Sequence, residues 1–113
     1  GRILLFGGTR TDTIRGFLAN AAYASAKTGL GVLVKSLAAE YGASGVSAAL
    51  MCPGLVDTEY LDEAARTRLQ AVSPRGRLIA PEAIAGLALS MLCGSMDLSN
   101  GAILTADEGL YSF

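Results

Sequence analysis

The sequence contains no histidine and no tryptophan, and only two of its 113 residues, Cys52 and Cys93, are cysteines. Without histidine, the chain lacks the commonest zinc ligand and the base of Ser-His-Asp and Cys-His sites. The two cysteines match no metal or redox spacing, which predicts a reduced setting with both thiols packed inside. Any proton transfer must therefore use tyrosine, lysine, aspartate or glutamate.

The chain also has little charge and no long apolar run. Charged residues make up 17% of it, and nine basic against ten acidic side chains give a formal net charge of −1. Because there is no basic surface, we expect small molecules, and neither nucleic acid nor a membrane, as partners. No apolar run reaches the roughly 18 residues of a membrane helix, and no signal-peptide pattern is present. The expected location is cytoplasmic.

What the chain has in abundance is apolar residues, at 51%, and glycine, at 14 residues. This composition is typical of a folded globular protein with tight turns. A length of 113 residues allows one domain, residues 1–113, but is short for a complete α/β enzyme. The length therefore indicates a portion of a larger fold.

The apolar pattern predicts alternating strands and helices. The expected elements are a fully buried strand at Arg2–Phe6, a helix at about Ala21–Tyr41, a strand at Val46–Met51, a charged and partly helical segment at Glu59–Gly76, a helix opened by Pro81, and a strand at Ala102–Ala106. This order implies right-handed crossovers and a parallel sheet, which is α/β architecture. Ligands of such sheets bind beyond the carboxyl ends of the strands, here at Gly7–Thr9, Pro53-Gly54 and Asp107.

The long predicted helix carries Tyr23 and Lys27 four residues apart, so their side chains share one face. Tyrosine and lysine at this spacing are common on solvated helices, and the pair alone indicates little. An ammonium close to a phenol favours the phenolate, which would suit Tyr23 to general acid–base chemistry. The residues around the pair decide between these two interpretations.

The run YASAK from Tyr23, followed by TGLGVLVKSLAAEYGASGVSAALMCPGLVDTE, resembles the short-chain dehydrogenase/reductase family. That family has a catalytic helix with Tyr-x-x-x-Lys and a following strand that ends in Pro-Gly. The later stretch GRLIAPEAIA and the last strand with Asp-Glu-Gly after it are similar to the family's last helix and strand. The resemblance spans nearly the whole chain. It implies the C-terminal half of a doubly wound, Rossmann-like parallel-sheet fold, without the dinucleotide-binding N-terminal half.

The resemblance also implies an enzyme, an oxidoreductase that uses NAD or NADP to interconvert a carbonyl and an alcohol. Tyr23 would exchange the proton with the substrate, and Lys27 would favour the phenolate and hold the nicotinamide ribose. Residues that would line the nicotinamide, its carboxamide or the phosphates are Pro53, Gly54, Val56 and Thr58. Members of the family commonly assemble through the catalytic helix and the last helix and strand, so a homodimer or homotetramer is expected.

The sequence departs from the family where a serine normally follows the first strand and polarises the substrate carbonyl. Gly7 and Gly8 stand there, and the usual spacing back from the tyrosine leads to Arg10. Thr9 is the nearest hydroxyl that could replace the serine as a catalytic residue. Losing such a donor costs about 10²–10³ in rate. Two alternatives therefore remain: a non-catalytic fragment that serves as a binding or oligomerisation module, and a fragment that folds poorly alone.

Overall fold

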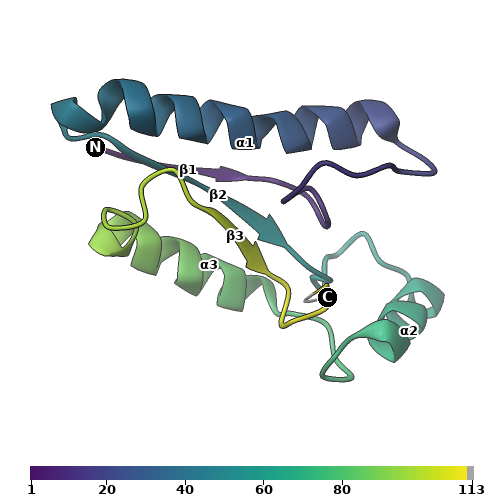
Figure 1. The fold of residues 1–113 in the computed structure, drawn as a ribbon. Helices are drawn as coiled ribbons and strands as arrows, with labels where there is room; N and C mark the ends of the chain where they lie inside the picture. Colours follow the sequence, from purple (N-terminus) through teal and green to yellow (C-terminus); the bar gives the residue numbers. More distant parts are fainter. Residues whose placement is uncertain (112–113) are drawn as a thin grey trace.

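A central strand, β2 (Ser47–Pro53), organises the computed structural model, which describes residues 1–111. The strands β1 (Arg2–Phe6) and β3 (Ile103–Ala106) both run parallel to it, in the sheet order β1-β2-β3 (Figure 1). The predicted parallel α/β arrangement is confirmed. The central strand continues two residues beyond the predicted Met51, because Pro53 at its end still pairs with β3.

Helices cover both faces of this sheet (Figure 1). One face is covered by α1 (Ala21–Tyr41), which ends in a short 3₁₀ turn at Gly42–Ser44. The other face is covered by α3 (Pro81–Ser90) and the π-helical turn η2 that follows it at Met91–Ser95. The short α2 (Glu63–Val72) lies beyond the carboxyl ends of the strands. The turns that follow the three strands therefore meet at the edge formed by the carboxyl ends of the strands.

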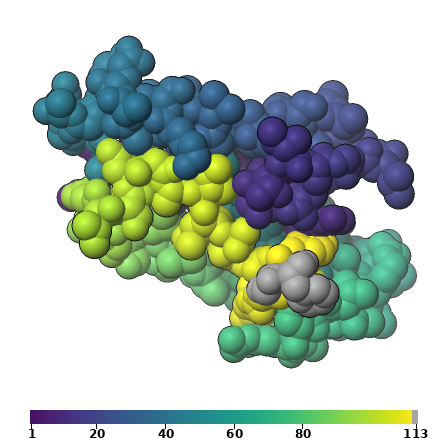
Figure 2. All heavy atoms as spheres, in the orientation of Figure 1, coloured from purple at the N-terminus to yellow at the C-terminus, as the bar shows by residue number. Residues whose placement is uncertain are grey.

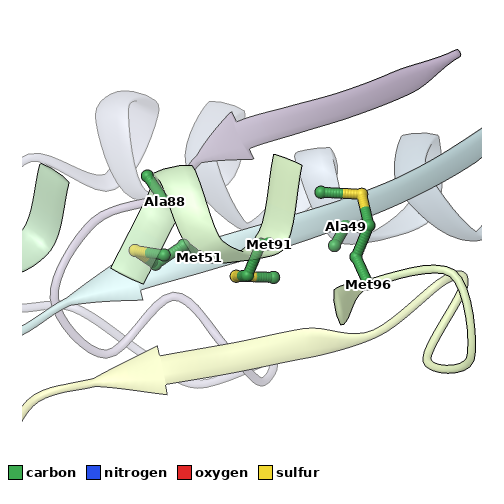
Figure 3. Close-up of a cluster of buried hydrophobic side chains, with 5 residues drawn as sticks. All are labelled: Ala49, Met51, Ala88, Met91 and Met96. Atoms are coloured by element: carbon green, nitrogen blue, oxygen red, sulfur yellow. The ribbon is translucent and has the colours of Figure 1, made fainter. Parts of the chain in front are cut away.

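The core follows from the alternation of side chains along β2, because successive residues of a strand point to opposite faces. On the α1 face, Val34 is fully buried against β2, in a cluster with Ala48, Leu50 and Cys52. On the α3 face, the buried cluster consists of Ala49, Met51, Ala88, Met91 and Met96 (Figure 3). A strand buried on both faces reads as one continuous apolar run, as this one does.

Three burial predictions are wrong. The strand β1 is not fully buried: Ile3 is 37% and Phe6 43% exposed, because β1 lies at the edge of the described sheet while the helices pack mainly on β2. The helical spacing of apolar residues on α1 predicts that Leu33 and Tyr41 share one apolar face with Val34, but both are exposed, since a three-stranded sheet covers only a narrow stripe of that helix. Cys93 is exposed in the turn after α3, whereas Cys52 is buried as expected.

The start of α3 agrees with the sequence. Pro81 occupies its first turn, where a proline costs no hydrogen bond, and Glu82 lies near the positive end of the helix. The helix within the charged segment, α2, begins where the Asp62 carboxylate accepts from the Ala65 N–H at 2.7 Å. Within residues 1–111, no helix is long and apolar enough to cross a membrane.

Candidate active site

The turn after β1 is closed by a threonine three residues farther along. The Gly7 N–H donates to the Met51 carbonyl at 2.8 Å and so extends the strand pairing by one residue. The Gly8 N–H donates to Thr11 Oγ1 at 2.8 Å, and the Thr11 hydroxyl donates back to the Gly8 carbonyl at 2.8 Å. Both polar groups of Gly8 are therefore held by one buried side chain.

A side chain on Gly7 would clash with its neighbours, and one on Gly8 would press against the Tyr23 phenol. A Cβ on Gly7 would lie 2.7 Å from Cys52 Sγ and 2.9 Å from Thr11 Oγ1. A Cβ on Gly8 would lie 3.0 Å from the hydroxyl oxygen of Tyr23. The position where the resemblance leads one to expect a serine is thus directly beside the phenol, and it carries no side chain.

Tyr23 and Lys27 meet this turn from the first two turns of α1. The helix begins after Asn20, whose positive φ of 60° turns the chain into it. Tyr23 is 56% exposed, with its hydroxyl over Gly8. The Lys27 Nζ donates to the Phe6 carbonyl at 3.1 Å and lies 5.9 Å from the centre of the Tyr23 ring. The phenol and the ammonium therefore share the end of β1.

Thr9 binds the turn that follows β2, at Pro53 and Gly54. Its hydroxyl lies 3.1 Å from the Pro53 carbonyl oxygen and 3.2 Å from that of Gly54, and it donates to this pair. Gly54 in turn donates its N–H to the Ala106 carbonyl at 3.0 Å. The ends of β1, β2 and β3 are consequently tied together in one layer of hydrogen bonds.

The segment after Gly54 is held by a short parallel bridge between Val56 and Ile79. The bridge uses the Asp57 N–H, which donates to the Ile79 carbonyl, and the Leu55 carbonyl, which accepts from the Ile79 N–H. It thereby fixes Val56 without using its own backbone N–H and C=O. Thr58, two residues on, is half-buried, and its carbonyl accepts from the Leu61 N–H at 3.2 Å.

The buried thiol of Cys52 packs under this layer. Burial raises the pKa of Cys52. A buried, protonated thiol suits the packing role that the sequence predicts, and it is not an activated nucleophile. Within the described residues, no group of three or more histidine, cysteine, aspartate or glutamate side chains could hold a metal ion.

Two features of the site were missed by sequence reasoning. Thr11 holds the Gly8 turn, although the sequence shows it only as one of several polar residues in a loop. Arg10 places its guanidinium 4.9 Å from the centre of the Tyr111 ring, a cation–π contact between ends of the chain about 100 residues apart. Figure 2 shows the loop after β1, in dark purple, against the start of α1 and close to the yellow C-terminal residues.

Known proteins resemble this chain over most of its length. A family model described as enoyl-(acyl carrier protein) reductase matches residues 7–111. The 3-oxoacyl-[acyl-carrier-protein] reductase FabG of Pseudomonas aeruginosa is 32% identical, with 98% of this chain and 45% of that protein covered.

Solved structures also resemble this chain over nearly its whole length. A short-chain dehydrogenase/reductase mutant from Serratia marcescens is 30% identical with a TM-score of 0.82, covering 97% of this chain and 45% of that one. A gluconate 5-dehydrogenase from Burkholderia cenocepacia in complex with NADP and tartrate is 27% identical with a TM-score of 0.84, covering 100% of this chain and 46% of that one. The chain thus spans less than half the length of each of these three proteins.

Proposed function

This chain belongs to the short-chain dehydrogenase/reductase family, and from that membership we propose that it forms the catalytic half of an oxidoreductase that interconverts a carbonyl and an alcohol. The observation that carries the proposal is the arrangement at the end of β1. There the Tyr23 hydroxyl lies against Gly8, and the Lys27 ammonium is bound to the Phe6 carbonyl beside the phenol ring. An exposed phenol with a cation close by, at the carboxyl edge of a parallel sheet, is suited to proton transfer to a bound ligand.

In the proposed reduction, the Tyr23 hydroxyl donates its proton to the substrate oxygen while a hydride reaches the carbonyl carbon. The C=O double bond becomes an alcohol, and Tyr23 is left as a phenolate. The positive charge of Lys27 stabilises that phenolate electrostatically. In the oxidation direction the same phenolate accepts the proton of the alcohol.

The residues at this edge fit a nicotinamide dinucleotide, NAD or NADP, which when bound would supply or accept the hydride. Lys27 has three donor hydrogens, and within the described residues the Phe6 carbonyl takes one, so the ammonium retains donors for ribose hydroxyls. The bridge at Val56 keeps that residue's own N–H and C=O available for a carboxamide. Pro53, Gly54 and Thr58 would lie beside the same ligand, and NADP is the dinucleotide in the similar Burkholderia cenocepacia structure.

We propose that the Thr9 hydroxyl replaces the family's serine as the donor to the substrate oxygen. Since its hydrogen is directed at the Pro53 and Gly54 carbonyls, it would have to leave them to reach a substrate oxygen. Exchanging Thr9 for valine tests this: a loss in kcat would support the role, and an unchanged kcat would remove Thr9 from the catalytic residues.

The substrate is proposed to be a small carbonyl or alcohol compound, and the protein a cytoplasmic homodimer or homotetramer. Exposed apolar side chains on the outer side of α1, such as Val32 and Leu33, support assembly through that helix. Light scattering of the complete natural protein measures the number of subunits directly.

The test of the function compares Tyr23→Phe with Tyr41→Phe in the complete natural protein. We expect Tyr23→Phe to lower kcat by about 10²–10⁴, the usual share of general acid–base catalysis, while dinucleotide binding is retained. Tyr41 is an exposed tyrosine at the other end of the same helix, and its variant should keep full activity. Turnover is followed by nicotinamide absorbance with a panel of ketones, aldehydes and alcohols. Wild-type turnover in Tyr23→Phe would refute the proposed mechanism.

A second candidate is a non-catalytic module that keeps the fold for binding or oligomerisation. The absence of a side chain at Gly8 favours it, because the substrate carbonyl then lacks the family's serine donor. For such a module, both tyrosine variants should leave assembly unchanged, and neither the variants nor the wild type should turn over any member of the panel.

A further inference from the structure

Thr11 is a buried hydroxyl to which the proposed reaction gives no role. It lies in the loop between β1 and α1 and is 1% exposed. Its Oγ1 contacts both polar groups of Gly8 at 2.8 Å, and its own N–H also donates to the Gly8 carbonyl at 3.3 Å. A single side chain thus decides the position of the Gly8 backbone.

The hydrogens around Thr11 can be assigned. The Thr11 hydroxyl has one hydrogen, which is directed at the Gly8 carbonyl, so its oxygen can only accept from other neighbours. In the 3.6 Å contact with Cys52, the thiol is therefore the donor. Because burial raises the pKa of Cys52, this thiol keeps its hydrogen. The result is a chain of hydrogen bonds that anchors the turn to the buried strand β2.

The turn that Thr11 holds is also the surface against which the phenol rests. A Cβ placed on Gly8 would point at the Tyr23 hydroxyl oxygen and lie only 3.0 Å from it. A shift of the Gly8 backbone toward or away from α1 would therefore either displace the Tyr23 hydroxyl or leave a gap beneath it. The place of the hydroxyl depends on where Gly8 is held.

We propose that Thr11 is a positioning residue for Tyr23: by holding both polar groups of Gly8, it fixes the surface that sets where the phenol meets the substrate oxygen. The proposal rests on the proposed function of Tyr23. A hydroxyl in this loop thus acts through the backbone at the position where the family resemblance leads one to expect a serine. Because Thr11 is buried, it would act through Gly8 and not by contact with a ligand.

The test uses Thr11→Val and Thr11→Ser in the complete natural protein. Valine has nearly the same volume but leaves the Gly8 N–H without its partner, and it leaves the Gly8 carbonyl only the longer bond, 3.3 Å, from the backbone N–H of residue 11. Since a misplacement of about 1 Å can cost roughly 10² in rate, we expect kcat to fall by about ten- to a hundredfold. Serine keeps the hydroxyl and should restore most of kcat. The exposed Thr67 on α2 supplies the matched control, Thr67→Val, with wild-type kcat.

The readout must separate positioning from loss of folded protein. We therefore refer kcat to the concentration of dinucleotide-binding sites, measured by fluorescence titration with the reduced dinucleotide. A merely structural role would lower the number of sites but leave kcat per site unchanged, and that result would overturn the proposal. If Thr11 positions Tyr23, Thr11→Val lowers kcat per site. The dissociation constant of the dinucleotide then stays within about twofold of wild type, because the contacts that bind the dinucleotide are unchanged.

If Thr11→Val does not fold, Gly8→Ala decides the question. It keeps every hydrogen bond of Thr11 but adds a methyl group 3.0 Å from the Tyr23 hydroxyl. A lower kcat per site supports the proposal, and a wild-type kcat overturns it. Tyr23→Phe separates failure of the proposed function from failure of the role of Thr11. If Tyr23→Phe is active, the proposed function fails, whereas an inactive Tyr23→Phe with a fully active Thr11→Val refutes only the role of Thr11.

Discussion

Gly54 lies where the turn after β2 meets the turn after β3. A Cβ at this residue would lie 2.6 Å from Asp107 Cβ and 2.7 Å from Asp107 Cα. The second of these atoms belongs to the backbone, so no rotation of a side chain can relieve the clash. The glycine of the Pro-Gly pair is therefore required here by packing, whatever it does for a bound ligand.

We predict that Gly54→Ala destabilises the protein by about 1–3 kcal/mol, the usual cost of overpacking. Gly86→Ala is the matched control, because a Cβ on this residue of α3 meets nothing within 4 Å. Replacing a helical glycine by alanine should stabilise by about 0.5–1 kcal/mol. Urea unfolding of both variants measures the two changes, and equal signs would contradict this reading of the turn.

The two cysteines should differ strongly in reactivity. Cys93 is exposed, whereas Cys52 is 2% exposed and burial raises its pKa, so little thiolate forms near neutral pH. We expect N-ethylmaleimide to label Cys93 in the native protein within minutes and Cys52 only after unfolding. Mass spectrometry of the two peptides gives the result. Rapid labelling of Cys52 in the native state would show that β2 opens.

Among the secondary-structure elements, β1 is held by a contact with a residue 95 positions away in the sequence. Arg2, its first residue, donates to both carboxylate oxygens of Asp97 at 2.9 and 2.7 Å, and Asp97 follows the π-helical turn η2. This paired contact joins the edge strand to the end of the α3 layer. Hydrogen bonds, first from Arg2 and then from Ser47, together with the charge of Arg2, lower the pKa of Asp97 from 3.8 to about 2.

The contribution of this pair to stability should depend on pH. Because the folded state lowers the pKa of Asp97, the contribution is fully present above pH 3.8 and is lost as the pH falls toward 2. We therefore predict that Asp97→Asn has a lower melting temperature than wild type at pH 7, and that the difference shrinks between pH 4 and pH 2. Thermal unfolding by circular dichroism tests this. A difference that persists unchanged at the lowest pH would assign the effect to something other than the ion pair.

The sheet as a whole has three strands, and β1 and β3 form its two edges within residues 1–111. The apolar residues Ile3 and Phe6 on β1, and Val32 and Leu33 on α1, are exposed. Unpaired strand edges and apolar patches of this kind favour association with other chains. The 113-residue chain therefore presents surfaces that a larger protein would cover.

We predict that the isolated 113-residue chain unfolds less cooperatively in urea than the complete natural protein does, and that it binds a fluorescent apolar dye. Covering the edge of β1 by a neighbouring strand removes both effects in the larger protein. Urea titration followed by circular dichroism, with the dye titration beside it, is the measurement. A sharp two-state transition without dye binding would contradict the prediction and show that three strands are sufficient.

The sequence by itself determined the order and type of the elements and the helical face shared by Tyr23 and Lys27. These depend on local patterns: the apolar run of β2, the helical spacing of α1, and proline at the start of α3. The family followed from motifs in the same order along the chain. Such features can be read from one segment at a time, because backbone periodicity alone fixes them.

Only the tertiary structure decided what lies around the phenol. The contacts between Thr11 and Cys52, between Thr9 and Pro53, and between Arg10 and Tyr111 join residues at least 41 positions apart. The exposure of β1 and of Cys93 likewise depends on which elements pack over them. No local sequence pattern encodes these contacts and exposures, because they depend on how segments distant in the sequence pack against one another.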